Sequence, residues 1–285
     1  MKKFKHLLVA LDHSQMDDVL IRYTSFFASY TKMKKVYFVH NIKKHDSDEI
    51  FDSIIPPDTL LGDTKKEILE KIQTNYTGKT DYEVIVSNEV STDNFISYNV
   101  LRYKIDLTIL GKKNHTDGSG TLTGKLLRSL KCSILLIPNH SKEQFNKILV
   151  GTDFSAIALR ATRIAFKLKT QTSEVDFAHI YSIPKHYLPF LNEEKIIQMT
   201  EQHANQQLEK FIKKTKIDAS YTSFYKINRK ENNIAVCLQK FADENHYDLL
   251  IIGDKGQNRL SSFLIGSVVE QLYNINFKTP VLVVK

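Results

Sequence analysis

The 285-residue chain lacks clustered cysteines and long apolar runs, and both absences restrict its function. Cys132 and Cys237 lie far apart without CxxC spacing, which predicts buried thiols rather than metal ligands. Histidines and cysteines are dispersed without recurring ligand spacing, so we expect no metal site formed by the protein. No apolar stretch approaches the roughly 18 residues of a membrane span, and Asp12 follows the basic N-terminus too soon for a signal peptide. We therefore expect a cytoplasmic protein with no membrane partner.

Basic residues exceed acidic ones, giving a net charge of +8 and a pI near 9.2. A surface for nucleic acid would place basic residues along one face with aromatic residues between them. The lysines are instead scattered, and pairs such as Lys34-Lys35 and Lys213-Lys214 fall in segments typical of helix ends or solvated helix faces. We expect no nucleic-acid partner.

An internal repeat divides the sequence into two similar halves. Four segments recur in one order at a shift of about 140 residues: HLLVALDHS with KILVGTDFS, VYFVHNI with VDFAHIY, YKIDLTILGKK with HYDLLIIGDK, and CSILLIP with TPVLVVK. Residues 139–146 are mostly polar and follow Pro138, which predicts a linker. The sequence thus predicts two copies of one domain, at residues 1–140 and 145–285.

Short apolar strands alternate with longer amphipathic stretches in each half, which is typical of βαβ units around a parallel sheet. In the second half, strands are expected at 148–151, 175–181, 220–227, 249–252 and 281–284, and helices at about 155–169, 193–215, 232–241 and 266–273. The helix at 193–215 should bury Ile197, Ala204, Leu208, Phe211 and Ile212. We therefore expect two tandem doubly wound (Rossmann-like) α/β domains, each a five-stranded parallel sheet with helices on both faces and right-handed crossovers.

The stretch LLIIGDKGQNRLSSFLIGSVVEQL at 249–272 carries the candidate binding site. Its apolar strand stops at Gly253, Gly256 follows, and Gly266-Ser267 lies after nine more residues, where apolar residues at helical spacing begin. Glycines let the backbone approach an anion, and the first-turn N–H groups of a helix face it. We expect the N–H groups of Gly253, Gly256 and Gly266 to bind a polyphosphate. The alternative is a βα loop whose glycines serve only tight turns.

Two common phosphate-binding motifs do not fit the glycines. A P-loop around Gly124-Lys125 would need glycine at Ser119 and a hydroxyl at Leu126. The dinucleotide fingerprint should follow the first strand of a domain, whereas the glycines of the second half follow the fourth.

The first half has a different loop at the equivalent place. Asn114 stands at the second glycine position, and its side chain would occupy space beside the phosphates. Either Lys125, after Gly124, or Thr121, after Gly120 in a loop about four residues shorter, would take the place of Ser267. Both alignments predict a weaker site than in the second half.

With these motifs the chain resembles the universal stress protein family in its tandem form, over nearly the whole length. The most specific element is GxxG, nine residues and G[S/T], which in that family marks members that bind ATP and which only the second half contains. The resemblance implies that Asp153 lies beside the adenosine. It implies an ATP site, with Mg²⁺, formed by the strand ends and the loop at Gly151, Thr152, Asp153, Ile180, Ile252, Gly253, Gly256, Gly266, Ser267 and Val268.

Several of these residues also have simpler interpretations. Asp153 could cap the following helix, because Asp is common at strand-to-helix junctions. His40 and His179 lie inside apolar strands, where buried histidines with satisfied hydrogen bonds are expected rather than ligands. In the first half, Asp12, His40 and Gly111 fit the family pattern.

The resemblance implies a cytoplasmic stress-response protein that binds ATP in its C-terminal domain and acts as a nucleotide-dependent regulatory or interaction module, not an enzyme. The alternatives are a slow ATPase or phosphotransferase using the same loop, and an interaction scaffold without nucleotide. Residues 134–137 and 281–284 form apolar strands that each end a half, and such strands pair between domains in the resembled family. We therefore expect packing about a pseudo-two-fold axis, with a further homodimer and an unknown protein partner left open.

Overall fold

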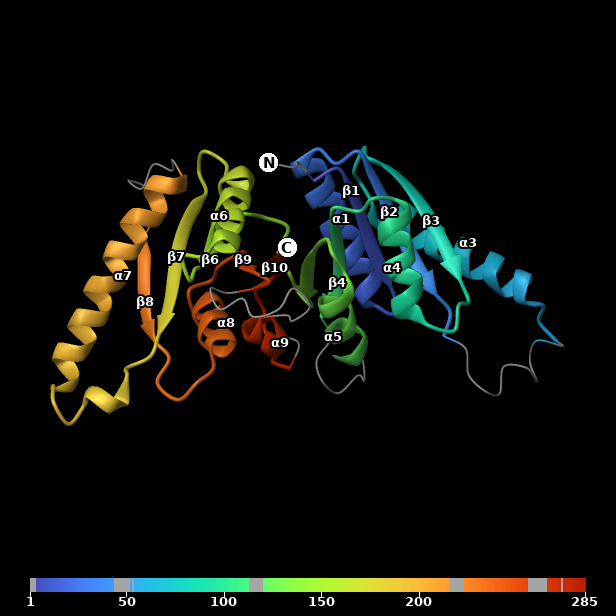
Figure 1. Cartoon of the computed structure of the whole chain (residues 1–285). Helices are drawn as coiled ribbons and strands as arrows, with labels where there is room; N and C mark the ends of the chain where they lie inside the picture. The colour runs from blue at the N-terminus through green and yellow to red at the C-terminus, as the bar shows by residue number, and fades with distance from the viewer. Residues whose placement is uncertain are drawn as a thin grey trace. The chain divides into compact units, whose positions relative to one another are not determined.

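Parallel strands flanked by helices form both halves of the chain in the computed structural model (Figure 1). The structure describes residues 4–43, 52, 54–112, 120–215, 223–255, 266–272 and 274–285. The chain divides into two compact units, Met1–Glu143 and Gln144–Lys285, and this boundary falls inside the predicted linker. The predicted α/β fold class is confirmed.

In the N-terminal unit the strand order is β3-β2-β1-β4-β5, with every neighbouring pair parallel. Its strands are β1 (His6–Leu11), β2 (Lys35–Asn41), β3 (Asp81–Ser87), β4 (Leu107–Lys112) and β5 (Ser133–Pro138). Its helices are α1 (Met16–Thr31), α3 (Pro57–Asn75), α4 (Thr92–Arg102) and α5 (Gly120–Ser129). Helices α1 and α3 pack together on one face of the sheet, and α4 and α5 on the other.

The C-terminal unit repeats this arrangement in the order β10-β9-β6-β7-β8, again with parallel neighbours. Its strands are β6 (Lys147–Gly151), β7 (Glu174–Tyr181), β8 (Phe224–Asn228), β9 (Leu249–Gly253) and β10 (Val281–Val284). Its helices are α6 (Ala156–Leu168), α7 (Glu193–Thr215), α8 (Ile234–Glu244) and α9 (Ser267–Leu272), with a 3₁₀ turn η2 (Lys185–Tyr187). Helices α6 and α7 cover one face, and α8 and α9 the other (Figure 1).

Local sequence explains where the helices of the C-terminal unit begin. Ser155 caps α6 by accepting a hydrogen bond from the N–H of Ala158, and Asn233 caps α8 by accepting one from Val236. Strands β6, β9 and β10 are almost wholly buried because helices cover both faces, which explains their continuous apolar sequences.

Two expected details differ in the structure. Helix α7 buries Ile196 with Ala204 and Phe211, whereas Ile197 is only half-buried, as are Leu208 and Ile212. Helical periodicity does not separate two adjacent isoleucines, since either one continues the apolar stripe. The third strand, expected at 220–227, is β8 at Phe224–Asn228, and residues 220–222 lie outside the described part of the chain.

Equivalent aspartates link the start of the first strand to the start of the fourth strand in both halves. Asp106 precedes β4 and accepts the N–H groups of Lys5 and His6 at the start of β1. Asp248 precedes β9 and accepts the N–H groups of Asn146 and Lys147 at the start of β6. The repeat thus preserves tertiary hydrogen bonds as well as strand sequences.

Across the described ranges, no helix combines the length and apolar character that crossing a membrane requires.

Candidate functional site

The candidate residues of the second half meet at the carboxyl ends of three neighbouring strands, with β6 lying between β7 and β9. The chain leaves β6 toward α6 on one face of the sheet and leaves β9 toward α9 on the other. Ligands of doubly wound sheets bind at such a point, where the connections diverge. The hydrogen bonding between β6 and β7 extends to this edge, since the N–H of Thr152 donates to the carbonyl of Ala178 at 2.9 Å.

Glycines at two of these strand ends are required by packing inside the protein. A Cβ atom on Gly151 would lie 2.9 Å from Cγ2 of Ile252, and one on Gly253 would lie 2.5 Å from Cγ2 of Ile157. Ile252 is itself 3% exposed, so it packs beneath the edge rather than on its surface. The expectation that Gly253 makes room for an anion therefore has a second physical cause, which the sequence did not reveal.

The start of α9 is drawn to the end of β9 by a backbone hydrogen bond. The N–H of Gly266 donates to the carbonyl of Asp254 at 2.8 Å, and a Cβ atom on Gly266 would lie 2.7 Å from that oxygen. The protein itself thus supplies an acceptor for the Gly266 N–H, and the contact of this N–H with a phosphate stays a prediction. Ser267 is exposed and Val268 is half-buried, and both lie in the first turn, whose N–H groups have no acceptor within the helix. Gly256 lies outside the described residues.

The turn after β6 presents a half-buried carboxylate. Oδ1 of Asp153 accepts the N–H of Ser155 at 3.0 Å, and Ser155, not Asp153, is the helix cap. Phe154 has φ of 63°, in the left-handed region that a bulky side chain rarely adopts. His13 has the same value at the equivalent turn of the first half. Such outliers are concentrated at functional sites, where the surrounding structure holds them.

The side chains of β7 complete this edge. Nδ1 of His179 lies 2.9 Å from the carbonyl oxygen of Thr152, and the Phe154 ring packs on the imidazole at 4.8 Å. In the first half, His40 contacts the carbonyl of Leu11 at 3.0 Å, so the prediction of satisfied histidines is confirmed. Ile180 follows His179 and is half-buried at the strand end.

The next residue, Tyr181, was not predicted to matter. Its hydroxyl donates to Oε1 of Glu201 at 2.9 Å, which links β7 to α7. Burial and this hydrogen bond raise the pKa of Tyr181 to about 12. Little in the sequence indicates this pair, because a tyrosine at a strand end and a glutamate on a long polar helix are both ordinary.

The equivalent edge of the first half carries ion pairs instead. Nε2 of His13 lies 2.9 Å from Glu67 of α3, and Nζ of Lys71 lies 3.5 Å from Asp17. Asp17 is completely buried, and its Oδ1 accepts the N–H of Asp12. Burial raises the pKa of the Asp17 carboxyl, with smaller opposing contributions that include Lys71. The corresponding part of the second half has Phe154 for His13 and Ala158 for Asp17.

The structure also decides between the two alignments of the first-half loop. Helix α5 begins at Gly120 and α9 at Ser267, so Gly120-Thr121, rather than Gly124-Lys125, lies at the start of its helix as Gly266-Ser267 does. Lys125 lies inside α5 with its Nζ 3.8 Å from Oδ1 of Asp93, so it points to α4. The shorter loop is therefore the correct alignment, and Asn114 lies outside the described residues.

The cysteines and the search for a metal site can be compared with the predictions from the sequence. Cys132 is buried, as predicted, whereas Cys237 is only half-buried, and neither takes part in a disulfide bond. In the ranges that the structure describes, no three His, Cys, Asp or Glu side chains are grouped as metal ligands would be.

Comparison with known proteins gives one family and a set of related folds. The model of the universal stress protein family matches residues 144–285. A protein of unknown function from Pseudomonas aeruginosa PAO1 aligns at 15% identity with a TM-score of 0.65, covering 99% of this chain and 92% of its own. A universal stress protein from Archaeoglobus fulgidus DSM 4304 aligns at 16% identity with a TM-score of 0.62, covering 98% and 96%. At these identities the likeness shows the fold. None of the curated proteins compared with the sequence matches it.

Proposed function

Because the chain belongs to the universal stress protein family through residues 144–285, we propose that its C-terminal half binds ATP with Mg²⁺ and that ATP occupancy controls interaction with a protein partner. One observation carries the proposal: the described candidate residues converge on one edge of one sheet, where β6, β7, β9 and the start of α9 meet. Its further support is the GxxG, nine-residue, GS motif, which marks ATP-binding members of this family.

The described side chains fit the parts of a nucleotide. Ile180 offers a half-exposed apolar surface suited to a base, and the Asp153 carboxylate can accept hydrogen bonds from ribose hydroxyls. Ser267 offers an exposed hydroxyl beside the first-turn N–H groups of α9, which suit phosphate oxygens. Gly151 and Gly253 contribute indirectly, since they let the strands and α6 pack closely beneath these groups.

The proposed role is regulation by occupancy rather than turnover. Fast phosphoryl transfer requires metal carboxylates and a base or water-orienting group placed around the γ-phosphate. Asp153, a carboxylate at this edge, already accepts the backbone N–H of Ser155. Its position by the turn supports a binding contact with the nucleoside.

Titration with Mg-ATP tests the proposal directly. Ligand at a hundredfold excess over its dissociation constant adds about 2.7 kcal/mol to the folded state, which raises the melting temperature by a few degrees. Ile180→Glu should weaken binding at least tenfold, because it places a carboxylate where the base is proposed to lie. Ile55→Glu is the matched control, since Ile55 is 49% exposed in the other half.

Three results would contradict the proposal or a part of it. A wild-type chain that gives neither heat nor a melting shift in millimolar Mg-ATP does not bind the nucleotide. Release of phosphate on the timescale of the titration, measured on the same samples, would replace the regulatory role by an ATPase. Equal affinities of Ile180→Glu and Ile55→Glu would move the site away from β7.

A further inference from the structure

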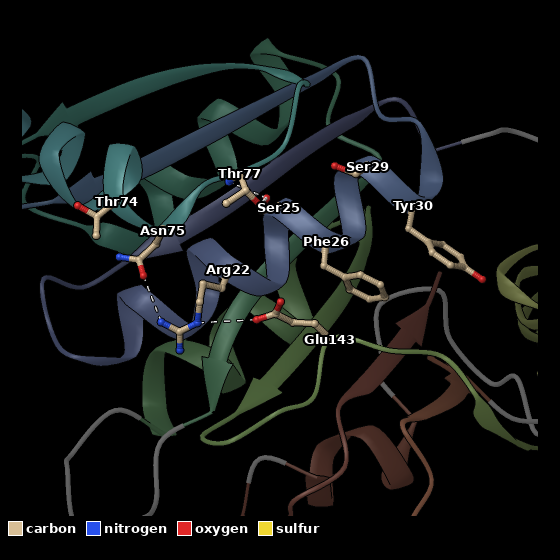
Figure 2. Close-up of a pocket in the computed structure, with 9 residues that line it drawn as sticks. All are labelled: Arg22, Ser25, Phe26, Ser29, Tyr30, Thr74, Asn75, Thr77 and Glu143. Atoms are coloured by element: carbon tan, nitrogen blue, oxygen red, sulfur yellow. Dashed lines mark hydrogen bonds and ion pairs between the residues drawn. The ribbon is translucent and has the colours of Figure 1, made fainter.

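A hollow of about 570 Å³ lies on the outer face of α1 in the N-terminal half (Figure 2). Its walls come from α1, the C-terminal end of α3, the connection to β3, and Glu143. The volume is within the range of small-molecule sites. The hollow lies on a different half of the chain from the proposed ATP site, and its lining mixes one guanidinium with hydroxyls and two aromatic rings.

Arg22 lies at one end of this hollow, between two side-chain partners (Figure 2). Its Nη1 donates to Oδ1 of Asn75 at 3.2 Å, and its Nε lies 3.7 Å from Oε1 of Glu143. Asn75 is itself fixed, because its Nδ2 donates to Oδ1 of Asp18 and to the carbonyl of Lys71. Among the described residues, Nη2 of Arg22 has no protein partner, so the guanidinium keeps donors for an added oxyanion.

Hydroxyls and rings continue the lining along α1. Ser25 and Ser29 are four residues apart, and the Ser25 hydroxyl accepts the N–H of Thr77 at 3.0 Å. The rings of Phe26 and Tyr30 lie with centroids 5.5 Å apart and form the apolar part of the lining. Figure 2 shows these groups following Arg22 along one helix. A ligand that contacts all of them must combine a negative charge, hydroxyl groups and an apolar face.

We propose that this hollow binds a monosaccharide carrying one oxyanion, either a phosphate or a carboxylate. Arg22 binds the oxyanion, the hydroxyls of Ser29 and Thr77 bind sugar hydroxyls, and the Phe26 ring lies against the apolar face of the sugar. The arrangement follows the general form of polar-ligand sites, in which a few placed polar groups orient a ligand against an apolar wall.

Glu143 gives this site a competitor within the chain. It is the last residue of the N-terminal unit, and its carboxylate holds Arg22 in the absence of ligand. A bound oxyanion takes the place of that carboxylate, so the ligand releases Glu143 from α1. Because Glu143 and Arg22 are 44% and 47% exposed, their pair is weak, and its removal tightens binding by about two- to fivefold.

Calorimetric titration of the full-length chain, without nucleotide, tests this assignment with four probes: glucose 6-phosphate, gluconate, glucose and inorganic phosphate. We expect millimolar or tighter binding of at least one charged sugar, with glucose and inorganic phosphate each at least tenfold weaker. Glucose 6-phosphate alone would assign the oxyanion as phosphate, and gluconate alone as carboxylate.

Three variants complete the test. Arg22→Gln should weaken the charged sugar at least tenfold, and Glu143→Gln should tighten it. Arg163→Gln, an exposed arginine of α6 in the other half, is the matched control and should leave the affinity unchanged. Absence of binding by both charged sugars would overturn the proposal, as would an affinity that survives Arg22→Gln or falls in Glu143→Gln. The outcome is independent of ATP binding by the C-terminal half.

Discussion

A Cβ atom on Gly253 would lie 2.5 Å from Cγ2 of Ile157, so α6 packs against β9 at a distance that only glycine allows. The first half repeats this relationship, since a Cβ atom on Gly111 would lie 2.9 Å from Cγ of Met16. In each half, a glycine in the last two residues of the fourth strand accommodates a side chain of the first helix. Close packing therefore requires glycine at an edge of the sheet where we also propose that ATP binds.

The first prediction is that Gly253→Ala destabilises the fold by overpacking. We expect the free energy of unfolding to fall by about 1–3 kcal/mol in urea denaturation. In an Ile157→Ala background the same substitution should cost less, because the clashing methyl group is gone. Gly62→Ala is the control: nothing lies within 4 Å of its Cβ position in α3, so it should stabilise the helix by up to about 1 kcal/mol. Equal costs in the two backgrounds would contradict the contact.

The second prediction is that Gly266→Ala moves the start of α9 away from the sheet and weakens ATP binding. In Gly266→Ala the new methyl group meets the Asp254 carbonyl oxygen at 2.7 Å, which forces α9 away from β9. We expect at least a tenfold loss of ATP affinity by calorimetry, with the far-ultraviolet circular dichroism of the folded chain retained. Unchanged affinity would show that α9 does not contribute to nucleotide binding.

The third prediction is that one chain binds one ATP. At the first-half edge, Glu67 contacts His13 and Lys71 contacts the buried Asp17, and the loop before α5 is about four residues shorter than the loop before α9. The carboxylates of Glu67 and Asp17 and the shorter loop weaken phosphate binding, and losing two phosphate hydrogen bonds at about 1.5–3 kcal/mol each lowers affinity at least a hundredfold. Calorimetry should give a stoichiometry near one per chain. A value near two would mean that the first half also binds.

Strand positions and the repeat could be read from the sequence because apolar runs and their order determine a parallel sheet. The second-half helices α6 and α7 were predicted within a residue or so, since Ser155 marks one start and a long amphipathic stripe defines the other. The positions of Gly253 and Gly266 were predicted, but not the contacts that require glycine there. Those contacts depend on the distance between α6, β9 and α9, which no local pattern encodes.

Interactions between distant polar residues could not be predicted either. The Tyr181–Glu201 hydrogen bond joins β7 to α7, and the Asp17–Lys71 ion pair joins α1 to α3. Arg22 lay on a helix face that periodicity assigns to solvent, although Ser25, Phe26, Ser29 and Tyr30 follow it at spacings of three, four, seven and eight residues. Such spacing puts side chains on one face, but only tertiary structure shows that α3 and Glu143 close a hollow around it.

The last prediction concerns the pH dependence of stability through Asp17. Burial raises the pKa of this carboxyl above its usual value near 3.8, so the folded chain binds the proton more tightly than the unfolded chain. The contribution of Asp17 to stability is therefore most favourable below pH 3.8 and is lost as pH rises through the folded-state pKa.

Asp17→Asn removes this titration while its amide oxygen still accepts the Asp12 N–H. The free energy of unfolding of the variant, minus that of the wild type, should increase from pH 4 to pH 7, by about 1.4 kcal/mol for each unit of raised pKa. Loss of the contact with Lys71 changes this difference in free energy by the same amount at every pH, since lysine stays charged throughout this range. It therefore leaves the slope of the difference against pH unchanged. Asp58→Asn, at an exposed position of α3, controls for removal of one carboxylate. A difference that stays constant or decreases with pH would show that water or a counter-charge compensates the buried Asp17.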